Sequence, residues 1–428
     1  MSVIKTCLIG VAVMLVAAKV WGQAAPSPFT DFGIGDAYGN SLIHNQGAGG
    51  IGVSHPQYWY LNNQNPALLV FNPLTVFEVG TIYESRTIKG EALREKNTGG
   101  NLSYLAVAFP VKVTKWTTSV GLMPYTHVSY NLQFPQQIRD NNGQVVDTAT
   151  VIQSGTGGLT QLYWSNGVRI SKSMSVGLKS TYIFGPIDNI YSNFVDNTAN
   201  GAIPYMINVD EKTSVTGFNF GLGYSFSKDS LGRRNQNRFS AGAVYMLEGN
   251  LKGKINRQLI RTTLSEDTVE RYPLSVVNGK IRLPSSVTVG VSYGKGASWM
   301  IGTEFFYQDW SSFKSVNKDD EGLGKAWRVS LGGEYTVDPN AVDNYLKRIT
   351  FRAGLNLERY PFLANAKAVD DLGINFGMSL PAGRSSVDLA FKFGKRGNKD
   401  ENVLEESYFK IFFGLTFNDQ WFIKRKFD

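Results

Sequence analysis

The chain has 428 residues, a net charge of +8, and only 18% charged residues. Its mean hydropathy of −0.17 resembles that of a soluble protein. A membrane β-barrel is not excluded, because it needs apolar residues only at alternate strand positions. No basic run is dense enough to indicate a nucleic-acid-binding stripe, so we expect no nucleic-acid partner.

Residues 1–22 have the pattern of a secretory signal peptide. Lys5 precedes the apolar run CLIGVAVMLVAA, and Val20 and Gly22 suit a cleavage site before Gln23. The run is short for a bilayer span, although an N-terminal membrane anchor is the alternative interpretation. Cys7, the only cysteine, lies within this run, so the processed chain would have no thiol. No later run approaches the length of a transmembrane helix.

Residues 23–74 show no strand-like alternation. They are rich in glycine, asparagine and aromatic residues, and include Phe29, Ile34 and Trp59, which are too apolar for a free tail. A wide barrel leaves a lumen unless something fills it. We therefore expect this segment to fold into the lumen as a hatch, and a periplasmic arm that docks a partner is the alternative.

Residues 75–417 alternate between apolar and mixed positions with a period of two. In YFKIFFGLTF one register holds Phe409, Phe413 and Phe417, and the other holds Lys410 and Thr416. Successive side chains of a strand leave opposite faces. The pattern predicts an all-β fold, a transmembrane antiparallel β-barrel of about 14 strands, with the phenylalanine register facing lipid.

The connections between the predicted strands alternate in length. Short turns such as KVTK, SKSM and LPAGRS alternate with long polar connections, expected at 131–155, 195–211, 255–283, 310–324, 359–369 and 395–405. Short periplasmic turns and long extracellular loops are typical of outer-membrane barrels. Two connections on the predicted periplasmic side, SKDSLGRRNQN and VDPNAVDNYLK, are longer than typical. Residues 418–428 are expected to form a C-terminal periplasmic tail.

Individual side chains of the barrel also carry predictions. Aromatic residues near strand ends are expected to form interfacial girdles, namely Trp116, Tyr125, Trp164, Trp299, Trp310, Trp327 and Trp421. Three basic residues are predicted to point into the lumen, namely Arg352, Lys392 and Lys410.

GAGGIGVS at 47–54 and NNQNPALL at 62–69 resemble the N-terminal hatch of the long-chain fatty acid transporter family of outer-membrane barrels. RLPSSVTVGVSYG at 282–294 and FFYQDWSSF at 305–313 follow in family order. The resemblance implies a fourteen-stranded barrel plugged by its hatch. It also implies that a hydrophobic molecule passes through an internal apolar site and is released by hatch rearrangement or a gap in the wall. The residues that take the hatch and gating positions are Gly47, Gly49, Gly50, Gly52, Asn65, Pro66 and Ala67.

An enzyme is disfavoured, and no cofactor or metal is expected. The chain contains only His44, His55 and His127. A Ser–His dyad would require His127 and Ser129 to meet, but residues two apart share a strand face by default. No nucleophile-elbow or His-rich metal motif is present.

We therefore expect an integral protein of the bacterial outer membrane. The leading functional hypothesis is passive uptake of small hydrophobic compounds such as long-chain fatty acids. The alternative is a barrel subunit or scaffold of an outer-membrane secretion complex, similar to type IX, or of a barrel-assembly complex. A general hydrophilic pore is disfavoured by the apolar segment 23–74.

Overall fold

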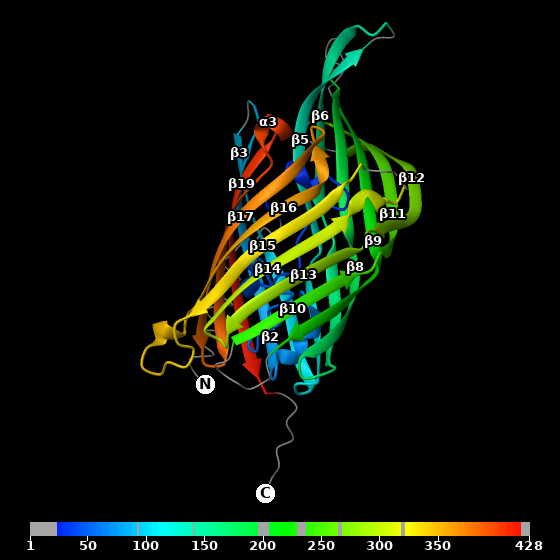
Figure 1. The fold of residues 1–428 in the computed structure, drawn as a ribbon. Coiled ribbons are helices and arrows are strands. Elements are labelled where there is room, and N and C mark those ends of the chain that lie inside the picture. The colour runs from blue at the N-terminus through cyan, green and yellow to red at the C-terminus, as the bar shows by residue number, and fades with distance from the viewer. Residues whose placement is uncertain are drawn as a thin grey trace, which may run out of the picture.

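The computed structural model describes residues 24–91, 94–139, 142–195, 205–228, 237–263, 268–317 and 322–420. The predicted signal peptide and most of the predicted tail lie outside these residues. No helix in these ranges is long and apolar enough to cross a membrane. Tilted antiparallel strands enclose the described part of the N-terminal segment (Figure 1).

The wall is one closed antiparallel sheet. Its strands are β2 (Thr75–Lys89), β3 (Arg94–Lys112), β4 (Trp116–Pro124), β5 (Thr126–Arg139), β6 (Val145–Gly157), β7 (Thr160–Arg169), β8 (Met174–Val195), β9 (Tyr205–Ser227), β10 (Asn237–Met246), β11 (Gly249–Thr262), β12 (Thr268–Leu283), β13 (Ser286–Lys295), β14 (Trp299–Asp309), β15 (Lys325–Thr336), β16 (Thr350–Ala364), β17 (Lys367–Ala382), β18 (Ser385–Arg396) and β19 (Glu405–Asp419). β19 pairs with β2 and closes the barrel.

The predicted number of strands is confirmed. Four wall strands are each interrupted, so that β4 and β5, β6 and β7, β10 and β11, and β12 and β13 are consecutive halves of one strand. Counted in this way, the described wall has fourteen strands. The remaining elements are short, namely η1 (Pro28–Thr30), β1 (Asp36–Ala37), α2 (Ile43–Gln46), η2 (Pro66–Phe71), η4 (Trp310–Ser312), η5 (Tyr345–Arg348) and α3 (Lys399–Asn402).

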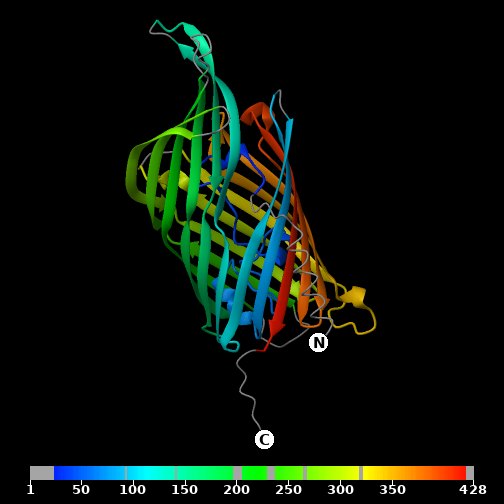
Figure 2. The ribbon, with the colours of Figure 1, turned by 180° about the vertical axis from the view of Figure 1, so that it is seen from behind.

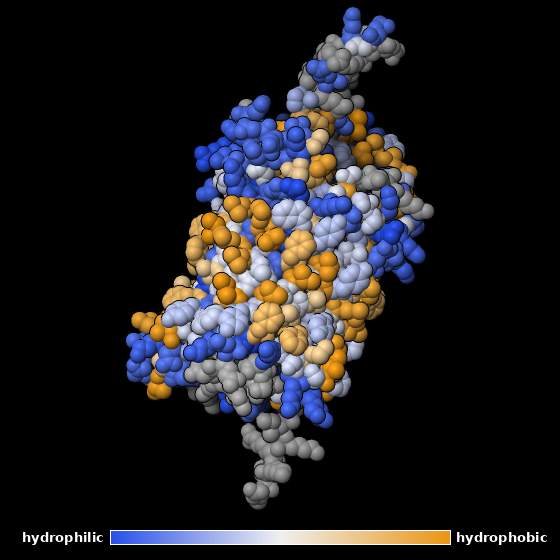
Figure 3. Space-filling model, viewed as in Figure 1, coloured by the Kyte–Doolittle hydropathy of each residue, from blue (hydrophilic) through white to orange (hydrophobic). Residues whose placement is uncertain are grey.

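The outer face of the wall carries the apolar register of each strand. On β19, Phe413 and Phe417 are exposed on the outside, whereas Phe412 and Thr416 point inward and are buried. Apolar residues gather in a broad zone around the middle of the barrel, with hydrophilic residues concentrated toward both ends (Figure 3). This arrangement confirms the lipid-facing register predicted for 409–417.

Three of the long loops expected from the sequence are mostly strand. Residues 131–155, 255–283 and 359–369 belong largely to extended hairpins, and β11 stays paired with β12 up to Thr262 and Thr268. The β5–β6 hairpin rises well beyond the rest of the wall (Figure 1). Beyond the lipid zone both strand faces meet water, so the apolar alternation that marks a transmembrane strand is lost although backbone pairing continues.

Two aromatic residues do not join an outer girdle. Trp116 and Trp164 are exposed on the outside, as predicted, but Tyr125 and Trp310 pack against an interior apolar cluster. Both residues lie outside the regular strands. Tyr125 lies between β4 and β5, and Trp310 begins η4, so neither follows the alternation of a regular strand.

The interior is filled by the described part of the N-terminal segment, which runs through the barrel in both ribbon views (Figure 2). One apolar cluster joins Phe29 and Ile34 to inward side chains of the wall, including Ile183, Leu251 and Phe362. A second cluster surrounds Leu42, Ile43, Leu61 and Leu69 of the same segment, together with Tyr104 and Tyr163 of the wall. The segment is therefore a second layer packed on the inside of the sheet.

Candidate functional site

A row of wall glycines accommodates the segment at its NNQNP motif. Gly167 of β7, Gly177 of β8 and Gly223 of β9 lie directly opposite one another on adjacent strands. A Cβ atom on any of the three would collide with Pro66. Only glycine lets the backbone of the segment approach this closely.

A second glycine pair accommodates the GAGG motif on the far side of the barrel. Gly332 of β15 and Gly354 of β16 are cross-strand partners, and a Cβ atom on either would collide with the backbone of Ala48. The segment turns here through Gly49 and Gly50, whose φ values are +76° and +84°. L side chains rarely adopt such angles, so these two positions favour glycine.

The remaining two predicted glycines also face the wall or the segment itself. A Cβ atom on Gly47 would lie 2.8 Å from Cα of Gly377. One on Gly52 would collide with the side chain of Gln64. The backbone N–H groups of Gly52 and Val53 both donate to Glu304 Oε2, each at 3.0 Å.

Asn65 links the segment to itself and to the wall. Its Oδ1 accepts a hydrogen bond from the N–H of Ala67 at 3.0 Å, which caps η2 where Pro66 begins it. Its Nδ2 donates to the carbonyl oxygens of Val53 at 2.8 Å and of Tyr224 at 2.9 Å. The side chain thus satisfies backbone groups that the irregular segment cannot pair by itself.

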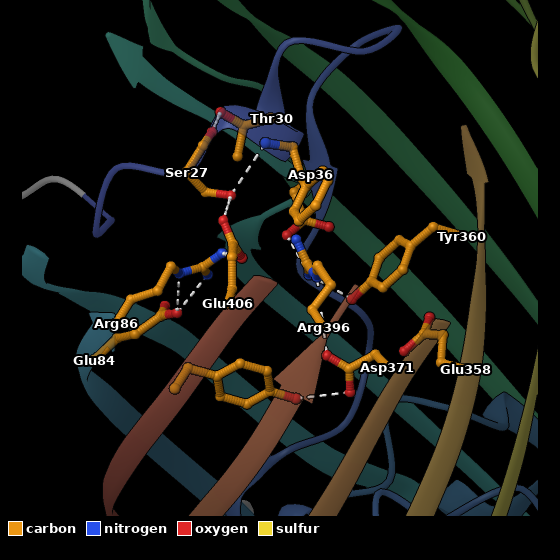
Figure 4. A network of polar contacts seen from close by, with 12 residues as sticks. Ser27, Thr30, Asp36, Glu84, Arg86, Glu358, Tyr360, Asp371, Arg396 and Glu406 are labelled. Atoms are coloured by element: carbon orange, nitrogen blue, oxygen red, sulfur yellow. Dashed lines mark hydrogen bonds and ion pairs between the residues drawn. The ribbon is translucent and has the colours of Figure 1, made fainter. Parts of the chain in front are cut away.

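Arg396 of β18 holds the segment through a buried ion pair (Figure 4). Its Nη2 lies 2.8 Å from Asp36 Oδ2, its Nε lies 3.8 Å from Asp371 Oδ2, and its guanidinium lies over the ring of Tyr360. Burial opposes the charge of Asp36, but the Arg396 guanidinium, together with His127 and Arg86, more than offsets burial and lowers the pKa of this carboxyl below its ordinary value. The interior segment and the wall are therefore joined by charges that have little access to water.

A second buried cluster lies beside the first (Figure 4). Arg86 of β2 forms ion pairs with Glu84 and with Glu406 of β19. The Glu406 carboxylate also accepts a hydrogen bond from Ser27 Oγ of the segment. Leaving any one of these charges alone in the interior would be costly, so the cluster favours the docked position of the segment.

The inward direction predicted for three basic residues is confirmed. Each faces a carboxylate: Arg352 lies 3.1 Å from Glu334, Lys392 lies 4.0 Å from Asp371, and Lys410 lies 3.5 Å from Glu84. The pattern predicts the direction of these side chains because strand faces alternate. It carries no signal for their partners, and it did not identify Arg86, Asp36 or Arg396.

The wall is unpaired between the upper parts of β3 and β5. β3 pairs with β4 from Lys112 up to Leu105, which lies opposite Leu122. Above this point β3 continues to Arg94 in pairing with β2 alone, and β5 pairs on its other side with β6. In the described chain, no β3–β5 backbone pairing closes this part of the wall.

The N-terminal segment covers the free edge of β5 at this gap. Asp36 and Ala37 form β1, which pairs antiparallel with His127 and Thr126. Farther along, the N–H of Ser27 donates to the carbonyl of Ser129 at 2.7 Å. Residues 27–38, which we call the bridging segment, thus supply the edge with backbone partners that a neighbouring wall strand would normally supply.

A cavity of about 420 Å³ lies at the gap. Its lining includes Leu102 of β3, Leu122 of β4, His127 and Val128 of β5, and Leu159. Neither ring nitrogen of His127 has a hydrogen-bond partner among the described residues. The His127–Ser129 pairing that a catalytic dyad would need is therefore not formed in this structure.

The other two histidines contact carboxylates of the wall. His55 Nε2 lies 2.9 Å from Glu334, and His44 Nδ1 lies 3.9 Å from Glu78. Within the described ranges, no three His, Cys, Asp or Glu side chains are grouped closely enough to hold a metal ion.

A closed fourteen-stranded antiparallel barrel with an apolar outer face is an integral protein of the bacterial outer membrane. A family model described as BamG matches residues 3–428, and the chain belongs to the BamG family. A search of curated protein sequences found no match.

Solved structures share the fold at low sequence identity. The toluene transporter TbuX of Ralstonia pickettii superposes with a TM-score of 0.55 at 14% identity, over 91% of this chain and 99% of that chain. The toluene transporter TodX of Pseudomonas putida gives 0.53 at 17% identity, over 91% and 100%. A FadL homologue of Pseudomonas aeruginosa gives 0.53 at 13% identity, over 89% and 98%. These likenesses support the predicted fold.

Proposed function

We propose that this protein mediates the passive uptake of small hydrophobic compounds across the outer membrane, with long-chain fatty acids as one candidate class. The observation that carries the proposal is the unpaired wall between β3 and β5, which lies beside a cavity and is covered by the bridging segment. The solved structures of similar fold described as toluene transporters add support.

The interior near the gap suits an apolar compound. Phe29 and Phe32 stack on Phe362 with ring centroids 5.7 and 4.6 Å apart. Val128 and Leu159 belong to the same apolar cluster and also line the cavity. A compound that reaches this cluster loses contact with water, which is worth about 25 cal/mol per Å² of apolar surface.

Release would then occur sideways through the gap into the membrane. The compound would pass between β3 and β5 once the bridging segment leaves the β5 edge. In this proposal the lower part of the segment acts as a hatch and stays in place, because Pro66 lies against the glycine row of β7, β8 and β9. The bridging segment would move relative to this fixed part, which is also held in place by the other predicted hatch residues, namely Gly47, Gly49, Gly50, Gly52, Asn65 and Ala67.

A reversible crosslink tests the lateral route. Ala37 and Thr126 are cross-strand partners, so cysteines at both positions, in a Cys7→Ser background, can form a disulfide that holds β1 on β5. In liposomes carrying the oxidised variant, uptake of fatty acids and of toluene should fall and should recover after reduction. A matched disulfide between Val289→Cys and Phe305→Cys on the outer wall should leave uptake unchanged. Unchanged uptake in the oxidised Ala37–Thr126 variant would exclude the gap as the route.

A scaffold role in an outer-membrane complex is the second candidate. The density of buried contacts favours it, since Arg396, Arg86 and Arg352 each pair with interior carboxylates around the segment. A lumen held in this way suits a barrel that presents surfaces to partners. Purification in gentle detergent discriminates the two roles. A stable stoichiometric complex without uptake activity supports the scaffold, and a lone barrel that transports the test compounds supports uptake.

A further inference from the structure

The connection between β15 and β16 is an ordered protrusion at the periplasmic end. It comprises residues 337–349, which we call the side loop, and it contains η5. The N–H of Asp338 donates to the carbonyl of Lys347 at 2.9 Å, and Asn344 Oδ1 accepts from the N–H of Leu346 and caps η5. The side loop stands out laterally from the barrel in both ribbon views, which are turned by 180° (Figures 1 and 2).

The side loop holds large apolar side chains away from the protein. Val342 is 101% exposed, Leu346 66% and Tyr345 44%. By contrast, Ala341 and Ile349 of the same loop are buried, so the loop has an inner and an outer side. An ordered loop that presents its largest apolar residues outward indicates a surface that is covered in the membrane or by a partner.

The outer side of the loop continues the lipid-facing surface of the wall. Tyr335 and Phe351 are cross-strand partners at the base of the loop and are both exposed on the outside. Trp299 pairs with Tyr335, and its ring contacts Tyr293 edge-on at 5.7 Å. Such an aromatic group is typical of the membrane–water interface, so the loop leaves the wall at the depth of the lipid headgroups.

The charges of the loop suit the same location. Lys347 Nζ lies 2.8 Å from Asp343, and the Arg348 guanidinium lies 5.1 Å from the centroid of the Tyr345 ring. The loop holds two acidic and two basic residues and has no net charge. Long basic side chains beside apolar and aromatic ones are typical of segments in the interface, because their stems lie on apolar surface while their charged ends stay in water. The side loop projects sideways from the barrel rather than away from the membrane into the periplasm, so it stays beside the bilayer.

We propose that the side loop is a membrane anchor that inserts Val342 and Leu346 among the phospholipids of the inner leaflet of the outer membrane. The anchor limits tilting of the barrel at β15 and β16, which lie four and three strands from β19 in the sheet. The longer periplasmic connection VDPNAVDNYLK thereby acquires a role that neither uptake nor chain reversal requires.

Depth-dependent fluorescence quenching tests the anchor. The full chain in a Cys7→Ser background, with Val342→Cys or Leu346→Cys labelled by an environment-sensitive fluorophore, is placed in liposomes of phosphatidylethanolamine and phosphatidylglycerol. Brominated phospholipids should quench both labels at least about threefold more than a label at Asp400→Cys in the exposed helix α3, because interfacial segments bury their apolar side about 5–10 Å deep. A label at Phe376→Cys, on the outer face of β17, is the positive control.

Quenching of Val342 and Leu346 labels no greater than that at Asp400 would overturn the proposal. If both labels are unquenched in liposomes but protected from a water-soluble maleimide in cells, a protein covers the loop and the lipid anchor is again refuted. Folding of each variant is checked by its shifted migration on gels without heating. Two labelled positions keep the test valid if one variant does not fold.

Discussion

Replacing Arg396 by leucine should release the bridging segment while leaving the wall closed. The Arg396 side chain is 4% exposed and lies 2.8 Å from Asp36 and 3.8 Å from Asp371. Removing one partner of a buried ion pair costs about 3–5 kcal/mol, because the remaining charge stays buried. If this cost falls on the docking of the bridging segment, its open population rises roughly a hundredfold to several-thousandfold.

Hydrogen exchange measured by mass spectrometry reports this population directly. Amide exchange in peptides covering residues 27–38 should accelerate by about the same factor as the open population, whereas peptides of β13 to β17 should keep their protection. Lys395→Leu is the matched control. Lys395 lies next to Arg396 in the chain, and its side chain is 56% exposed. Its partner Glu405 keeps a second cation, Lys89, at 3.5 Å, so the change should cost at most about 1 kcal/mol.

A double variant measures how much of the effect comes from the ion pair between Asp36 and Arg396. Asp36→Asn combined with Arg396→Leu removes both members of the pair and should restore part of the lost protection. Unchanged exchange at residues 27–38 in Arg396→Leu, with the barrel intact, would show that the ion pair does not hold the segment. The reasoning that joins the charge network to gating would then fail.

Three further outcomes follow from the same structure. The pKa of Asp36 is lowered in the docked state, so its contribution to docking is present above about pH 4 and is lost as the pH falls through the folded-state pKa. Protection of residues 27–38 from exchange should therefore be constant from about pH 8 to about pH 5 and should decrease below about pH 4. In Asp36→Asn this decrease should be smaller. Gly177→Ala should expose the NNQNP motif to protease because its Cβ would collide with Pro66, whereas Gly324→Ala, whose nearest contact is 3.5 Å, should not. Phe376→Lys on the lipid face of β17 should destabilise folding into vesicles by about 2–4 kcal/mol near the bilayer midplane, as measured by urea titration, and a cost near zero would contradict the assigned lipid face.

The scaffold and anchor proposals differ in whether the periplasmic end of the barrel is accessible to a partner protein. If the side loop lies in lipid, the rim at β15 and β16 is not available to a soluble partner. A partner of the scaffold would then contact other surfaces, such as the tall β5–β6 hairpin on the opposite end (Figure 1). Crosslinking from Val342 and from the hairpin strands, performed in the same purified sample, separates these possibilities.

Local pattern alone predicted the barrel and the orientation of its side chains. The alternation in 409–417 predicted that Phe413 and Phe417 face lipid, and the same rule predicted that Arg352 points inward, because both depend only on the pleat of one strand. Apolar alternation failed where strands extend beyond the lipid, as in β5 and β6. There the solvent is water on both faces, so no period-two signal is required of the sequence.

Only the tertiary structure decided which distant residues meet. Asp36 and Arg396 are separated by 360 positions, and the glycines that accommodate Pro66 come from three different strands. Their meeting depends on the register of the whole closed sheet and on the path of the segment inside it. The open edge of β5 arises in the same way, since pairing of β3 stops where the strand interruption after Pro124 turns β5 away, and the bridging segment supplies the missing backbone partners.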